Sequence, residues 1–127
     1  MKDLVVGMGE ALWDMLPEGK KIGGAPANFA YHVKQFGLDS CVISAVGNDD
    51  LGNEIVDNFD TKQLNHNIER VAYPTGTVQV EIDQAGVPVY DIKENVAWDN
   101  IPYTAKIENI AQRTRAVCFG SLAQRNV

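Results

Sequence analysis

Four residues in the first part of the chain have the chemistry needed to bind a hydroxylated small molecule. Asp14 can accept hydrogen bonds from hydroxyl groups, and Asn28 can both donate and accept them. Gly23 and Gly24 allow the backbone to adopt positive φ and to approach a ligand closely, because neither has a side chain. These residue types suit a polyol site, and the two glycines would equally suit a tight turn that binds nothing.

Residues 22–37 are expected to place the two glycines and Asn28 at the start of a helix. Pro26 fits the first helical turn, where its missing N–H is no loss. Gly37 stands where a C-terminal cap belongs. The free N–H groups at the start of such a helix would by themselves favour an anion. Four apolar residues between the two ends recur at helical spacing: Phe29, Ala30, Val33 and Phe36.

A buried strand and an extended segment are expected before this helix. Residues 4–9 are almost continuously apolar, as in the strands of a buried parallel sheet. The glycines of this run do not complete a dinucleotide-binding fingerprint, because Leu12 occupies the position of the third glycine. Residues 10–15 alternate in polarity, which predicts an extended segment with Asp14 near its end.

Strands and helices are expected to alternate through the rest of the core. Residues 41–46 predict a buried strand, and Asp49 or Asp50 can cap the helix that follows. Residues 106–114 predict another helix, and residues 115–120 another buried strand. This order is typical of an α/β protein with a mainly parallel sheet.

A different pattern, strict alternation, predicts a β-hairpin from residues 77–83 and 87–92. The dry face of the hairpin is expected to carry Val78, Val80 and Ile82. Pro88 restricts the second strand to an edge or a bulge. A small separate sheet of this kind could be a lid over a site or a contact between two copies of the chain.

Composition restricts the classes of partner. The chain has 127 residues and a net charge of -6 with a pI near 4.7, which argues against nucleic-acid and anionic-membrane partners. We find no membrane-spanning apolar run and no signal peptide, and we expect a cytoplasmic protein. Cys41 and Cys118 lie in apolar runs and are expected to be buried reduced thiols. No metal site is expected, because the chain has only two histidines and no metal-ligand spacing.

Several sequence blocks together resemble the N-terminal half of a ribokinase-family (PfkB-type) carbohydrate kinase, with the greatest similarity to fructokinases. The match covers essentially the whole chain, and the GGAPAN block is specific to this family. The resemblance implies an α/β fold: part of a ribokinase-like three-layer α/β/α domain with a mainly parallel sheet, plus a small β-sheet lid. Residues 1–127 would form the N-terminal part of one such domain, with lid strands at about residues 12–22 and 75–97. The blocks are VVGMGEALWDMLP, GGAPANFAYHVKQFG, VGNDDLGNEIVDNF, TGTVQVEIDQAGVPVY and AVCFGSLAQR.

The resemblance also implies an ATP-dependent transfer of phosphate to a terminal hydroxyl of a sugar. Asp14, Gly24 and Asn28 match positions that hydrogen-bond sugar hydroxyls, and Gly23 supplies the tight backbone. Val78 and Tyr90 match lid positions that cover the sugar with apolar surface.

The family's catalytic Asp lies in a G-A-G-D motif of the C-terminal half, where ATP and Mg²⁺ also bind. This chain has no such motif, so it is expected to contain no catalytic residue and to be inactive alone. A non-catalytic sugar-binding module and a homodimer formed through the lid are alternatives. Within the family, a nucleoside or 2-keto-3-deoxygluconate kinase is another.

Overall fold

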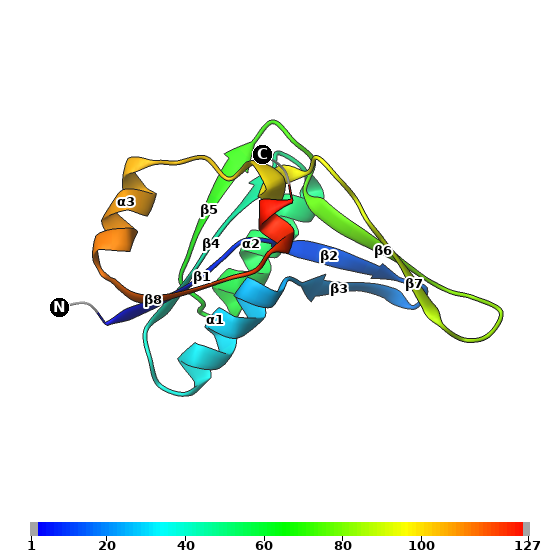
Figure 1. Cartoon of the computed structure of the whole chain (residues 1–127), viewed down its shortest axis with the longest axis horizontal. Helices are drawn as coiled ribbons and strands as arrows, with labels where there is room; N and C mark the ends of the chain where they lie inside the picture. The colour runs from blue at the N-terminus through cyan, green and yellow to red at the C-terminus, as the bar shows by residue number, and fades with distance from the viewer. Residues whose placement is uncertain (1–2, 126–127) are drawn as a thin grey trace.

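A computed structural model describes residues 3–125, which form two four-stranded sheets (Figure 1). In sheet A the strand order is β5-β4-β1-β8, and every neighbouring pair is parallel. The predicted α/β class with a mainly parallel sheet is therefore confirmed. The bounds of the four strands are Leu4–Met8 for β1, Ser40–Gly47 for β4, His66–Val71 for β5 and Thr114–Phe119 for β8.

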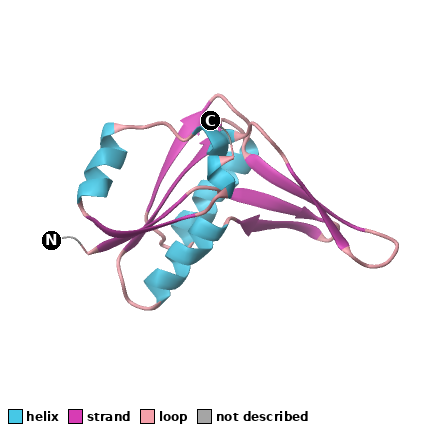
Figure 2. Cartoon of the chain, in the orientation of Figure 1, coloured by secondary structure: helices cyan, strands magenta, loops and turns pink. Residues whose placement is uncertain are grey.

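Helices cover both faces of sheet A, which gives the predicted three-layer arrangement (Figure 2). Helices α1 (Ala25–Gln35) and α2 (Asp50–Thr61) pack on one face, and α3 (Ala105–Gln112) packs on the other. Successive side chains of β4 point alternately to the two faces of sheet A. Val42 contacts the α1 and α2 cluster, whereas Ile43 contacts Ile107 and its neighbours from α3.

Local sequence signals define the ends of these helices. Gly37 has a φ of 88°, and the N–H of Leu38 donates to the Val33 carbonyl oxygen at 3.3 Å, as in a glycine-capped helix end. The Asp49 carboxylate caps α2 by accepting from the Gly52 N–H at 2.8 Å. Both capping predictions are confirmed. No helix within residues 3–125 is long and apolar enough to span a bilayer.

Sheet B begins at the carboxyl end of β1, because only Gly9, Glu10 and Ala11 separate β1 from β2. Its order is β3-β2-β6-β7, with β2 and β6 parallel and the two outer pairs antiparallel. It extends away from sheet A on the right of Figure 1. The strands are β2 (Leu12–Leu16), β3 (Gly19–Gly23), β6 (Gly76–Ile82) and β7 (Pro88–Ile92).

The prediction that residues 115–120 form a buried strand is wrong about burial. Strand β8 forms there, but it pairs with β1 alone among the described residues and lies at the edge of sheet A. Val117 and Phe119 are 50% and 65% exposed, and Cys118 is half-buried. An apolar run specifies a strand, whereas burial also requires a neighbour on both sides.

The predicted dry face of the hairpin is also only partly correct. Val78 and Val80 are buried in a cluster with Leu12 and Trp98, but Ile82 is 60% exposed. Ile82 is the last residue of β6, next to the hairpin turn, and lies outside that cluster. Pro88 lies on an edge strand as predicted, because β7 is the outermost strand of sheet B.

Candidate functional site

The strand order of sheet A identifies the edge at which a ligand is expected to bind. After β1 the chain continues to β4 and β5 on one side, and it then returns to place β8 on the other side of β1. The carboxyl ends of β1 and β8 therefore flank a topological switch point, where open parallel sheets bind ligands. Sheet B starts beside this point, so the candidate site lies where sheet B meets the carboxyl edge of sheet A (Figure 1).

Asp14 and Gly23, predicted separately, lie in contact across β2 and β3. A Cβ atom at Gly23 would lie 2.7 Å from Asp14 Oδ2, so a side chain there would force the carboxylate to move. Burial raises the pKa of the half-buried Asp14 carboxyl above its ordinary value. The site thus contains a carboxylate that is partly removed from water and held against bare backbone.

Gly24 connects this contact to the start of α1. It is the N-terminal cap residue, with a φ of 117°, and a Cβ atom there would lie 2.3 Å from the Glu10 carbonyl oxygen. The N–H of Asn28 donates to the Gly24 carbonyl oxygen at 3.1 Å, and the Asn28 side chain is exposed. A Cβ at Gly7 would lie 2.1 Å from the Pro26 carbonyl oxygen, so the start of α1 packs directly on β1.

The two lid residues lie on the same face of sheet B as Asp14. Asp14 is the cross-strand partner of Val78, and Val80, two residues further on, is the partner of Tyr90. Cross-strand partners point to the same face of a sheet, as do residues two apart on one strand. Val78 is 5% exposed, whereas Tyr90 is 63% exposed. This face therefore combines a carboxylate with an uncovered aromatic ring.

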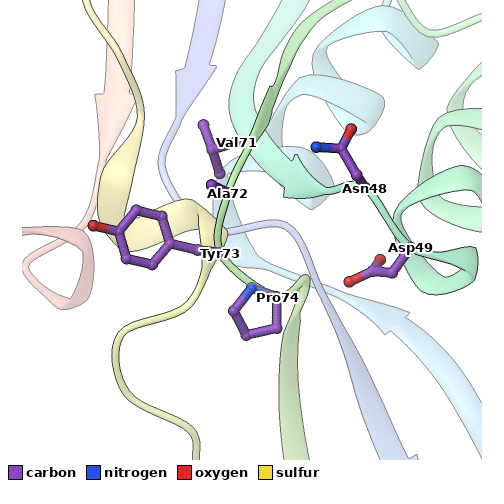
Figure 3. A pocket seen from close by; sticks show the side chains of 6 residues that line it. All are labelled: Asn48, Asp49, Val71, Ala72, Tyr73 and Pro74. Atoms are coloured by element: carbon purple, nitrogen blue, oxygen red, sulfur yellow. The ribbon is translucent and has the colours of Figure 1, made fainter.

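An open pocket of about 290 Å³ lies next to the ends of β4 and β5 (Figure 3). Its lining residues come from the turn after β4 and from the segment that leads from β5 toward the lid. None of the predicted site residues lines it. The lining residues are Asn48, Asp49, Val71, Ala72, Tyr73 and Pro74.

The hydrogen bonds of Asp49 indicate that this acid has a structural role. Besides capping α2, its carboxylate accepts from the Thr75 N–H at 3.0 Å and from the Thr75 hydroxyl at 2.5 Å. Burial raises its pKa, but the bonds from Thr75 and Gly52 and the positive charge of Arg70 outweigh that effect and lower it overall. Asp49 therefore joins the β4–α2 turn to the chain entering β6.

Asp99 and Arg125 form an ion pair that no sequence pattern indicated. Arg125 Nε and Nη2 donate to the two Asp99 carboxylate oxygens at 2.8 and 2.7 Å, and the guanidinium lies 4.4 Å from the centre of the Trp98 ring. Arg125 also donates to the Lys93 carbonyl oxygen at 2.7 Å. The pair joins the chain after β8 to the chain that returns from the lid, and no local pattern connects residues 26 positions apart.

The described chain thus combines a parallel α/β core, a small sheet at the carboxyl edge of that core and a glycine turn at the start of α1. Residues 18–124 match the family model described as pfkB family carbohydrate kinase, and the chain belongs to this family. The predicted family resemblance is confirmed.

Three relatives are informative. A protein from Pyrococcus horikoshii that is described as an uncharacterized sugar kinase is 30% identical over 94% of this chain and 42% of its own length. Its crystal structure matches with a TM-score of 0.81 over 43% of that chain, and its complex with ATP matches with a TM-score of 0.77. An ATP-dependent 6-phosphofructokinase from Thermoanaerobacterium thermosaccharolyticum is 30% identical over 92% of this chain and 39% of the relative. A fructokinase from Klebsiella pneumoniae is 37% identical over 62% of this chain and 28% of the relative. The chain thus spans less than half the length of these relatives.

Proposed function

We propose that this chain is the part of an ATP-dependent sugar kinase that binds the sugar, and that the sugar is fructose or a close analogue. The observation that carries the proposal is the contact between Asp14 and Gly23, on the same sheet face as the exposed Tyr90 ring. Family membership and the fructokinase relative support the choice of sugar.

Each residue has a role in the proposed site. The Asp14 carboxylate accepts hydrogen bonds from sugar hydroxyls, and Gly23 and Gly24 let the backbone approach the ring. Asn28 contributes its amide from the first turn of α1, and the exposed Tyr90 covers the apolar side of the sugar, whereas the buried Val78 supports the sheet face from within its cluster. A half-buried carboxylate binds neutral hydroxyl groups and repels phosphate, which favours an unphosphorylated acceptor at this position.

Nucleotide binding is assigned to the rest of the protein. The sequence contains no G-A-G-D motif, in which the family resemblance places the catalytic Asp. Phosphoryl transfer needs a positioned acceptor, a nucleotide with its metal ion and a base. The 127-residue chain alone is therefore proposed to be inactive, and fructose-dependent ATP turnover by it would contradict this.

Asp14→Asn is expected to weaken fructose binding by the protein from the complete reading frame about 10- to 100-fold, because charged hydrogen bonds are lost. Stability should be unchanged or slightly higher at neutral pH. A raised pKa means that the Asp14 contribution is fully present only below the ordinary Asp pKa and is lost as pH rises through the folded-state value. Calorimetric titration and urea unfolding at pH 7 measure the two effects.

Asp91→Asn is the matched control for this variant. Asp91 is an exposed carboxylate in the same sheet, but it is the cross-strand partner of Gln79 and so points to the opposite face from Val78 and Asp14. Its substitution should leave fructose affinity unchanged. Equal affinities of the wild type and Asp14→Asn would show that the assigned site is wrong.

A second candidate function is pairing of two copies through the lid, because apolar side chains near the hairpin turn are uncovered. Ile82 and Tyr90 are 60% and 63% exposed, and Ile92 on the same face is 38% exposed. Sedimentation velocity should find a dimer that Ile82→Lys converts to a monomer without loss of fructose binding. A wild type that stays monomeric at high concentration would contradict pairing.

A further inference from the structure

Glu10 has a buried carboxylate with an unsatisfied oxygen. The residue is 6% exposed, and Oε2 is buried without a hydrogen-bond partner in the part of the chain that the structure describes. Its carbonyl oxygen lies under Gly24, where a Cβ atom would approach to 2.3 Å. Glu10 therefore lies directly beneath the glycine turn of the proposed sugar site.

The carboxylate also lies at the topological switch point. Glu10 follows the end of β1 and Gly120 follows the end of β8, and these two strands are in register from Val5 and Ala116 to Met8 and Phe119. Among described residues, the one contact of a Cβ placed on Gly120 would be Glu10 Oε1 at 4.0 Å. The space beside Oε1 is thus open on the side of β8.

A buried carboxylate without a partner is costly, and buried acids in proteins are normally paired with a positive charge or with several donors. None of the ion pairs within residues 3–125 includes Glu10. A neutral hydroxyl could satisfy one oxygen, but it would not offset the charge. A guanidinium or ammonium group satisfies both requirements.

The exposed side of β8 indicates where such a group would come from. Strand β8 has an unpaired edge in the described chain, and its Val117 and Phe119 side chains are largely uncovered. This chain also spans only 42% of the length of the Pyrococcus horikoshii relative. Additional protein that pairs with this edge would lie next to Gly120 and the open side of Oε1.

We propose that Glu10 is a positioning residue that binds an arginine or lysine side chain supplied by the rest of the protein where it covers β8. The ion pair holds the carboxyl end of β1 in place beneath Gly24 and so fixes the glycine turn. The effect on the sugar site rests on the proposed function, whereas the ion pair itself does not.

The test uses the protein from the complete reading frame and the variant Glu10→Gln, which keeps the shape and removes the charge. If the pair forms, the variant should melt at least about 5 °C below wild type, because a buried cation loses its partner. Fructose phosphorylation should fall at least tenfold in kcat. Glu10→Ala should be partly rescued by formate or acetate, since a small carboxylate can refill the space, and a purely structural cavity would not respond in this way. Glu81→Gln, at an exposed carboxylate of the lid, is the control and should match wild type.

Three results would overturn the proposal. A Glu10→Gln variant that melts at or above the wild-type temperature would show that the carboxylate has no partner. An effect that requires added K⁺ or Mg²⁺ would identify a metal ion instead of a side chain. A change in fructose KM alone, with no change in melting, would identify a substrate hydroxyl. If wild type does not bind fructose but Glu10→Gln still lowers the melting temperature, the pair stands and the proposed function fails.

Discussion

Gly24→Ala is expected to lower the free energy of unfolding by about 4 kcal/mol, as the sum of backbone strain and overpacking. It should also abolish measurable fructose binding by the protein from the complete reading frame. Gly24 has a φ of 117°, which alanine rarely adopts, and the added Cβ would lie 2.3 Å from the Glu10 carbonyl oxygen. The Cβ atom is fixed to the backbone at position 24, and the oxygen belongs to the backbone of Glu10, so neither can rotate away. The collision can be removed only if α1 moves relative to the end of β1. Urea unfolding and calorimetric titration measure the two losses.

Gly19→Ala is the control that separates the cost of backbone strain from the cost of the collision with Glu10. Gly19 has a similar φ of 131°, but a Cβ there would meet nothing within 4 Å. This control should show only the strain, about 1–3 kcal/mol. Its fructose affinity should remain close to that of wild type. If the two variants lose the same free energy of unfolding, the collision with the Glu10 carbonyl oxygen adds nothing to the cost of Gly24→Ala, and this prediction is wrong.

Asp99→Ala is expected to cost about 2–3 kcal/mol of unfolding free energy, because it removes the charged hydrogen bonds of a partly buried ion pair. The Asp99 side chain is 2% exposed and that of Arg125 is 18% exposed. The substitution also removes the acceptor of the Val96 N–H, which Asp99 Oδ2 binds at 3.1 Å. Asp91→Ala, which breaks the exposed pair with Lys93, should cost less than about 1 kcal/mol.

The effect of Asp99→Ala should depend on pH. Burial raises the pKa of Asp99, but the hydrogen bonds and charge of Arg125 outweigh it, so the pKa lies below its ordinary value. A lowered pKa gives stability that is present above the unfolded-state pKa, about 4, and is lost as pH falls through the folded-state value. The stability difference between wild type and Asp99→Ala should therefore shrink below about pH 4. A difference that stays constant down to pH 2 would contradict this assignment.

Local sequence signals were sufficient for the helices and most strands. Pro26 and Gly37 marked the ends of α1, and Asp49 marked the start of α2, because capping depends on residues only a few positions apart. The edge strand β5 was not predicted, since its half-buried residues do not give a continuous apolar run. Composition and periodicity also indicated the α/β class that the structure has.

The candidate site was predicted in part. Residue chemistry and the family resemblance selected Asp14, Gly23 and Gly24, and the structure places them together at the start of α1. Asn28 and Tyr90 are exposed, and the binding roles of all the selected residues stay predictions. Glu10 was not selected, although an acid that directly follows a buried strand is a signal that could have been used.

The sequence by itself determined most of the segments that become helices and strands, and the family that the chain resembles, because those properties depend on neighbouring residues and short motifs. Only the tertiary structure decided which side chains are covered and which charges are paired. Ile82 and Val117 have the same apolar character as Val78, yet they are exposed because nothing in the described chain packs on them. Asp99 meets Arg125, and Glu10 is left with an unpaired oxygen, for the same reason: burial and pairing are set by contacts between distant segments.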